Sequence, residues 1–146
     1  MSRADIESLI PHRGAMCLLE RVCDWDQAQV RLATATHRDP ANPLRRDGHL
    51  AALHLCEYGA QAMAVHGGLT ARAEGRQAPP GFLVSLRSVS LHCEHVEDLS
   101  GELEVVAERL QATPTTWQYA FRVSHEGRVL AEGRAAVIAR TDSVED

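Results

Sequence analysis

This 146-residue sequence lacks several features that would place a protein in a broad class. No apolar run approaches the roughly 18 residues of a membrane-spanning helix, so we expect no membrane segment. The N-terminal stretch carries Asp5 and no long apolar segment, so we expect no secretory signal. Lysine is absent, all the basic residues are arginine, and the formal net charge is −5. We therefore expect no nucleic-acid-binding surface.

Cysteine pairs with the CxxC spacing of metal or redox motifs are also missing. The four cysteines stand in apolar runs: Cys17, Cys23, Cys56 and Cys93. This distribution predicts reduced, buried thiols in a cytoplasmic protein. The sequence "HCEH" at 92–95 resembles a metal motif. If these residues form a strand, His92 and Glu94 face one way and Cys93 and His95 the other, so we expect no metal site.

The length predicts one domain covering residues 1–146, which can bury roughly 70% of its unfolded surface. Ser2 predicts the N-cap of a short helix over 2–10. A second helix is predicted from about His49 to Val65, ended by the Gly67-Gly68 pair. Hydrophobic alternation predicts strands over 16–22, 30–36, 82–93, 102–111, 116–124 and 129–140.

The second helix is the most informative element. Its sequence "LAALHLCEYGAQAMAV" is apolar nearly all round, which is typical of a buried helix with a sheet curled around it. His54, Glu57 and Gln61 interrupt this pattern on one stripe of the helix. A buried carboxylate must be paired, neutral or functional, because burying a bare charge is costly. A structural network and a stripe that faces solvent remain the alternatives.

Four stretches, in their order and spacing, resemble the 3-hydroxyacyl-(acyl carrier protein) dehydratases. They are "IPHRGAMCLLERV", "EYGAQAMAVHG", "GFLVSLRSVSL" and "HEGRVLAEGRAAV". The resemblance implies an α+β hotdog fold, a curved antiparallel sheet wrapped around one long helix. It also implies a dimer with two sites at the interface. Within that family, the loop "HRDPANPLRRDG" is most similar to dehydratases of aryl-polyene clusters.

The resemblance also implies roles for individual residues. His37 would be the base that removes a proton from C2 of a 3-hydroxyacyl thioester, since imidazole titrates near neutrality. Glu57 would protonate the leaving hydroxyl, because desolvation in an apolar helix raises a carboxyl pKa. Gln61 would orient Glu57, and backbone N–H groups near the helix start would polarise the thioester. No metal or organic cofactor is expected.

The sequence departs from the family pattern in two places. His37 lies twenty residues before Glu57, whereas the family histidine lies about fourteen before, so "LRRDG" is interpreted as an insertion. His49 and His54 therefore remain alternative bases. Ser85 stands where relatives often have a glycine. His12 is interpreted as structural, and Arg13 as a possible anchor for a carboxylate or carbonyl within the dimer.

Arginines in the loop suggest a partner. Arg38, Arg45 and Arg46, with Arg87 as a further candidate, would form a basic rim that steers an acidic acyl carrier protein bearing a 4'-phosphopantetheine-linked substrate. An ordinary solvated loop is the alternative. A homodimer is expected, with a heterodimer or higher oligomer left open. Two other functions also remain: a hotdog thioesterase, and a non-catalytic subunit of a dehydratase heterodimer.

Overall fold

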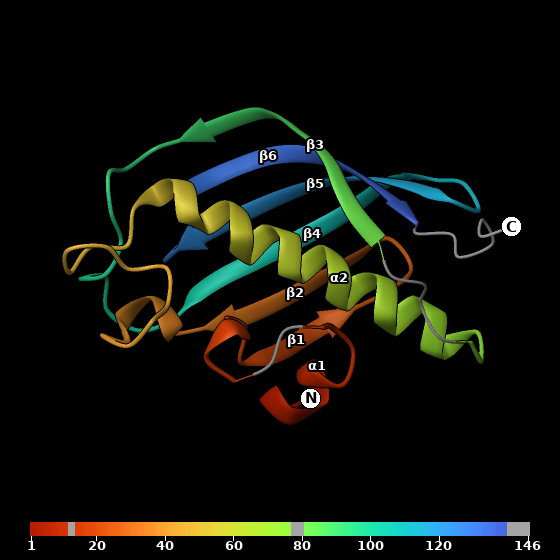
Figure 1. Ribbon diagram of the computed structural model, residues 1–146, viewed down its shortest axis with the longest axis horizontal. Helices are drawn as coiled ribbons and strands as arrows, with labels where there is room; N and C mark the ends of the chain where they lie inside the picture. Colours follow the sequence, from red (N-terminus) through yellow and green to blue (C-terminus); the bar gives the residue numbers. More distant parts are fainter. Residues whose placement is uncertain (12–13, 77–80, 140–146) are drawn as a thin grey trace, which may run out of the picture.

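A curved sheet and one long helix make up most of the structure (Figure 1). It is a computed structural model that describes residues 1–11, 14–76 and 81–139. Its antiparallel strands lie in the order β1-β2-β4-β5-β6-β3. Their bounds are β1 (Arg21–Trp25), β2 (Gln29–Thr34), β3 (Gly81–Leu91), β4 (Leu103–Ala112), β5 (Thr116–His125) and β6 (Arg128–Ala139). The predicted α+β architecture, with the sheet wrapped around the helix, is confirmed.

The helices differ in length and in role. Helix α2 (Leu55–Ala73) lies across the concave face of the sheet, and α1 (Arg3–Glu7) lies beside β1 (Figure 1). The described residues also form three 3-10 turns: η1 (Gly14–Met16), η2 (Thr36–Arg38) and η3 (Ala52–His54). Ser2 is the N-cap of α1, as predicted, and it also forms a capping box with Asp5, but the helix is shorter than the predicted range 2–10. No helix within the described residues is long and apolar enough to cross a membrane.

The predicted bounds of the long helix are wrong at both ends. Helix α2 begins at Leu55 rather than near His49, and it continues through Gly67 and Gly68 to Ala73. Glycine costs a helix interior about 1 kcal/mol relative to alanine, so the pair does not by itself stop a well-packed helix. Gly68 also permits a close approach, because a Cβ there would lie 3.1 Å from the side chain of Leu9.

The apolar run after η1 does not form the predicted strand. Cys17, Leu18 and Leu19 are buried, but β1 begins only at Arg21. Side chains bond this segment instead: the Leu18 carbonyl accepts hydrogen bonds from the hydroxyls of Thr34 and Thr36, at 2.6 Å each. Burial of the run therefore does not depend on strand pairing.

Alternation in β5 places its apolar residues against α2. Tyr119, Phe121 and Val123 are buried, and Trp117 packs against the same core. Strand β3 lies at the end of the strand order, and its outer edge has no neighbouring strand in the described chain. Leu86 and Leu91 on this strand remain about 40% exposed (40% and 42%), which leaves an apolar edge available to a partner.

Candidate active site

A buried polar network joins the start of α2 to the turn η2. The Tyr58 hydroxyl lies 2.9 Å from Oγ1 of Thr36 and accepts a hydrogen bond from the Asn42 side-chain nitrogen at 3.0 Å. Asn42 also donates to the Thr36 carbonyl at 2.9 Å. Because Thr36 precedes His37 and Tyr58 follows Glu57, this network fixes the two segments that carry the predicted catalytic pair.

His37 is held as a neutral imidazole with one nitrogen unused. Its Nε2 lies 2.8 Å from the Leu99 carbonyl oxygen. A carbonyl only accepts hydrogen bonds, so Nε2 carries the proton and Nδ1 carries the lone pair. Nδ1 is buried and has no hydrogen-bond partner in the part of the chain that the structure describes. Burial lowers the pKa of His37; the bond to Leu99 opposes this shift, and Arg38 and Arg45 add to it.

Glu57 lies in the first turn of α2 and is half-buried. The N-terminal end of a helix carries a partial positive charge, which favours a carboxylate there. The 3-10 turn η3 leads directly into α2, so the N–H groups of His54 and Leu55 already donate to the carbonyls of Ala51 and Ala52. Beside the Glu57 carboxyl group, this end of α2 therefore offers the positive end of the helix dipole rather than a set of free N–H donors.

Gln61 connects α2 to the segment before β1. Its amide nitrogen donates to the Met16 carbonyl at 2.7 Å, and its amide oxygen accepts from the Leu18 N–H at 2.9 Å. Both ends of the fully buried amide are thus bonded to the segment before β1. These hydrogen bonds make Gln61 a clamp between α2 and residues 16–18, and its role in orienting Glu57 stays a prediction.

The other predicted site residues are spread over several places. His54 forms the N-cap position of α2, and its Nδ1 is buried without a hydrogen-bond partner among the described residues. His49 is exposed, and its Nδ1 lies 2.7 Å from Oε2 of Glu97. Ser85 lies exposed on the edge strand β3, opposite Ala136 of β6. His12 and Arg13 lie outside the described residues.

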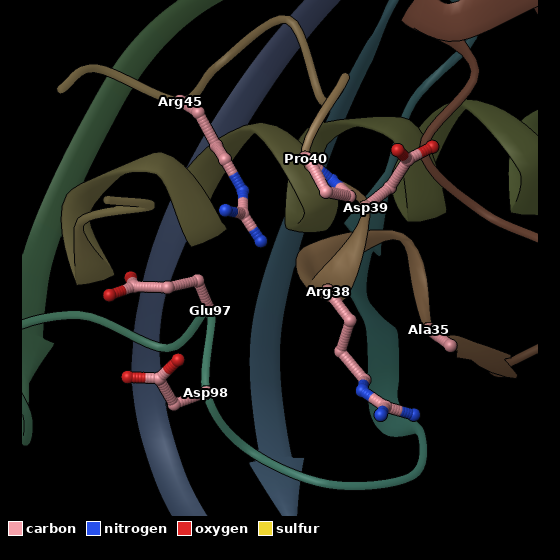
Figure 2. A pocket seen from close by; sticks show the side chains of 7 residues that line it. All are labelled: Ala35, Arg38, Asp39, Pro40, Arg45, Glu97 and Asp98. Atoms are coloured by element: carbon pink, nitrogen blue, oxygen red, sulfur yellow. The ribbon is translucent and has the colours of Figure 1, made fainter. Parts of the chain in front are cut away.

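An open pocket of about 560 Å³ lies next to η2 (Figure 2). Figure 2 shows the Arg45 guanidinium pointing into it, and Arg38 on its far side. Its lining residues are Ala35, Arg38, Asp39, Pro40, Arg45, Glu97 and Asp98. Two arginines against three carboxylates leave a net formal charge of −1, so this pocket is not the basic rim that was predicted.

Two of the predicted rim arginines have local structural contacts. Arg45 donates to the His37 carbonyl at 3.2 Å, and Arg46 donates to the carbonyls of Pro43 and Arg45 at 2.9 and 2.8 Å. Arg38 is the exposed arginine of the pocket. Arg87 lies apart on β3, where it donates to Gln118 at 3.3 Å.

The "HCEH" stretch at 92–95 is not a continuation of β3, which ends at Leu91. The chain bends there, so the expectation that His92 and His95 would lie on opposite faces of a strand is wrong in its premise. His92 pairs with Glu132 at 3.0 Å, whereas His95 lies 3.3 Å from Glu97.

Sequence reasoning missed Thr36, Asn42 and Tyr58. A tyrosine in an otherwise apolar helix is a usable signal, because a buried phenol nearly always requires a hydrogen-bond partner. Asn42 stands between two prolines, where an asparagine typically forms local turns. Its side-chain oxygen does accept a hydrogen bond from the Leu44 N–H at 2.9 Å, while its side-chain nitrogen donates to the Thr36 carbonyl and the Tyr58 hydroxyl.

The fold and the buried site define a hotdog-fold protein, and comparisons identify its family. The model of the ApeP-like family, described as ApeP dehydratase, matches residues 4–145, so the chain belongs to this dehydratase family. This confirms the resemblance found in the sequence. No curated protein matches the chain.

Solved structures agree with the fold. The dehydratase heterocomplex ApeI:P from Xenorhabdus doucetiae matches with a TM-score of 0.84 and 24% identity, over 94% of this chain and 91% of that one. A hypothetical thioesterase protein with coenzyme A from Streptococcus pneumoniae matches with a TM-score of 0.61 and 13% identity, over 82% and 84%. The phenylacetic acid degradation protein PaaI from Thermus thermophilus matches with a TM-score of 0.59 and 17% identity, over 82% of this chain and 92% of that one.

Proposed function

We propose that this dehydratase converts 3-hydroxyacyl thioesters on acyl carrier protein to trans-2-enoyl thioesters, in the biosynthesis of polyene or fatty-acid-like chains. The observation that carries the proposal is the state of His37. Its ring is fixed through Nε2–H, and its Nδ1 is left with a lone pair and no partner among the described residues. A general base for a weakly acidic C–H bond requires such a nitrogen.

The reaction needs two groups on opposite sides of the substrate. Nδ1 of His37 takes the C2 proton, and the electron pair of that C–H bond forms the C2–C3 double bond. The C3–O bond breaks as Glu57 protonates the hydroxyl, which leaves as water. The positive end of the α2 dipole stabilises the negative charge that develops on the thioester oxygen. This route uses no cofactor.

A second subunit completes the proposed site. The apolar edge of β3 favours pairing with another sheet. We propose that the His37 segment of one subunit serves the same site as Glu57 of another. The partner is a second copy or, as the ApeI:P heterocomplex suggests, a related dehydratase subunit. The free cysteines fit a reducing compartment, and we propose the cytoplasm.

Enoyl formation from a 3-hydroxyacyl thioester tests the activity directly. Absorbance of the conjugated enoyl product supports the proposal, whereas release of free thiol indicates a thioesterase. Glu57→Gln should reduce kcat by about 10²- to 10⁴-fold, as loss of a general acid usually does. Because burial lowers the pKa of His37, the base stays neutral and kcat/KM should stay level until the pH falls well below 6.5.

Carrier recognition needs a separate experiment. Arg45 supports the His37 backbone, so its substitution would disturb the site itself. Arg38→Glu is the sharper test, with Arg46→Glu as the control for charge. Reversing Arg38 should raise KM for a carrier-bound substrate more than for a short pantetheine thioester. Equal effects on both substrates would exclude Arg38 from carrier binding.

If the purified chain is inactive on both substrates, adding a partner dehydratase subunit distinguishes two explanations. Recovery that is abolished by Glu57→Gln in this chain shows that it supplies the acid to a shared site. Recovery that survives both Glu57→Gln and His37→Gln shows a non-catalytic subunit.

A further inference from the structure

Two histidines and one glutamate gather beside the pocket, outside the proposed catalytic pair. Nδ1 of His49 lies 2.7 Å from Oε2 of Glu97, and Nδ1 of His95 lies 3.3 Å from the same oxygen. The two imidazole rings stack, with centroids 4.6 Å apart and an interplanar angle of 30°. One ligand atom from each of the three residues lies within 4.8 Å of the others. Both rings therefore present the same type of nitrogen to one carboxylate.

The backbone holds this cluster in place. Arg46 and His49 exchange two hydrogen bonds, of 2.9 and 3.0 Å, around a turn. The next residues pair with the segment that carries His95 and Glu97: Val96 donates to the Leu50 carbonyl at 3.0 Å, and Ala52 to the Glu94 carbonyl at 2.9 Å. Two segments more than forty residues apart in sequence are thus connected directly at the cluster.

The carboxylate is fixed more firmly than the histidines. The Glu97 side chain is 5% exposed, and its Oε1 accepts the Leu50 N–H at 2.9 Å, which leaves Oε2 directed at the two histidines. The side chains of His49 and His95 are 58% and 45% exposed. A buried carboxylate anchored by a backbone N–H resembles a metal ligand with its supporting hydrogen bond, and the open histidine side leaves a path for an ion.

We propose that His49, His95 and Glu97 form a binding site for a divalent transition metal of the zinc class. Two imidazoles and a carboxylate are typical ligands of Zn²⁺ and Co²⁺. Zinc–ligand bonds of about 2.0–2.1 Å place tetrahedral ligand atoms about 3.3 Å apart. The His95–Glu97 pair already has that spacing, at 3.3 Å, whereas the His49 nitrogen lies closer to Glu97, at 2.7 Å. The ligand atoms span up to 4.8 Å, so the exposed His49 ring must shift away from Glu97 and toward His95 to complete a tetrahedral set. Water or an external ligand takes the fourth position.

The position of the site gives it a structural role. Glu97 lines the pocket of Figure 2, and Leu99, two residues further on, holds Nε2 of His37. A bound ion would tie the turn at 46–49 to the segment at 94–97 and so stabilise the protein. This proposal does not depend on the dehydratase activity.

Titration of the metal-free, tag-free chain with Zn²⁺ and Co²⁺ tests the site, using calorimetry and the visible absorbance of Co²⁺. We expect one ion per chain and a melting temperature that rises with added Zn²⁺ by mass action. His49→Ala and His95→Ala should each weaken binding by at least about 10-fold, since even lost supporting hydrogen bonds cost 10- to 100-fold. Both side chains are exposed, so the variants should fold.

His92→Ala and Cys93→Ser are the matched controls. His92 lies in the same segment and pairs with a glutamate at 3.0 Å, so its loss tests a generic histidine–glutamate pair. Cys93→Ser tests thiolate binding. Both variants should bind the metal like the wild type. Absence of saturable binding, or binding that survives the combined loss of His49 and His95, would overturn the proposal. So would loss of binding in Cys93→Ser.

Discussion

The hydroxyl of Tyr58 provides the sharpest prediction about the site, because it connects the two segments that carry the proposed catalytic pair. Asn42 donates to it, and it donates to Oγ1 of Thr36, which in turn donates to the Leu18 carbonyl. Tyr58→Phe removes the link but keeps the ring and its packing. Thr36 retains its bond to Leu18, and Asn42 retains one bond to the Thr36 carbonyl. One buried N–H of Asn42 is left without its acceptor.

The expected cost follows from this inventory. Two net hydrogen bonds of about 0.5–1.5 kcal/mol each give a loss of about 1–3 kcal/mol. For a chain of this size, each kcal/mol lowers the melting temperature by about 2–4 °C, so the fall should be about 2–12 °C. Melting curves at fixed protein concentration measure it, since association makes the midpoint concentration-dependent. We also expect kcat to fall while KM changes little, because the η2 turn carries His37.

Tyr119→Phe is the matched control. This tyrosine is also buried, and its hydroxyl lies 2.8 Å from Nδ1 of His66, further along α2 and away from the Tyr58 network. Its loss should lower the melting temperature by a similar amount without a specific fall in kcat. The reasoning is refuted if both variants reduce kcat equally, or if Tyr58→Phe leaves stability and kcat unchanged.

Further substitutions test the packing, the acid stability and the edge strand. Gly59→Ala should lower the free energy of unfolding by about 1–3 kcal/mol, because its Cβ would lie 2.4 Å from a ring carbon of Phe121. Gly67→Ala is the control: a Cβ there would meet nothing within 4 Å, so the variant should be as stable as the wild type or more stable. Urea denaturation measures both. Burial works to raise the pKa of Glu97, but its hydrogen bonds outweigh this effect and hold the pKa at about 2. Because the pKa of Glu97 is lower in the folded protein than in the unfolded chain, the ionised side chain stabilises the fold above about pH 4.5, and this stabilisation is lost as the pH falls toward 2. Glu97→Gln should therefore flatten the acid limb of a curve of unfolding free energy against pH. Leu86→Arg on the apolar edge should shift the chain toward monomer in analytical ultracentrifugation; an unchanged mass would place the interface elsewhere.

Much of the fold could be predicted because local patterns and tertiary structure agree. The alternation of β5 and the N-cap at Ser2 both appear as expected. The predictions failed where packing outweighed local preference. Gly67 and Gly68 look like a helix end, but the helix is held through them by its neighbours. The apolar run at 17–19 looks like a strand, but side chains from other elements satisfy its backbone.

The sequence proposes residues for the site but not the contacts between them. The family resemblance suggests His37 and Glu57, whose roles stay predictions, whereas the Tyr58 network depends on an approach of η2 to α2 that no local pattern encodes. The histidine–glutamate cluster has the same origin. His49 and Glu97 are separated by 48 positions, and only the backbone pairing of their segments makes them neighbours.

Complementation between two inactive variants is the most direct test of the central claim that His37 and Glu57 act on one substrate from different subunits. His37→Gln keeps an N–H for the Leu99 carbonyl but lacks the basic nitrogen, and Glu57→Gln lacks the acid. Each should be nearly inactive alone in the enoyl assay. Random pairing in a two-fold dimer makes about half the molecules mixed, with one intact site in two. The account predicts that co-expression restores about a quarter of wild-type activity. If the wild-type protein is active and the mixed dimers are folded but show only background activity, the account is contradicted.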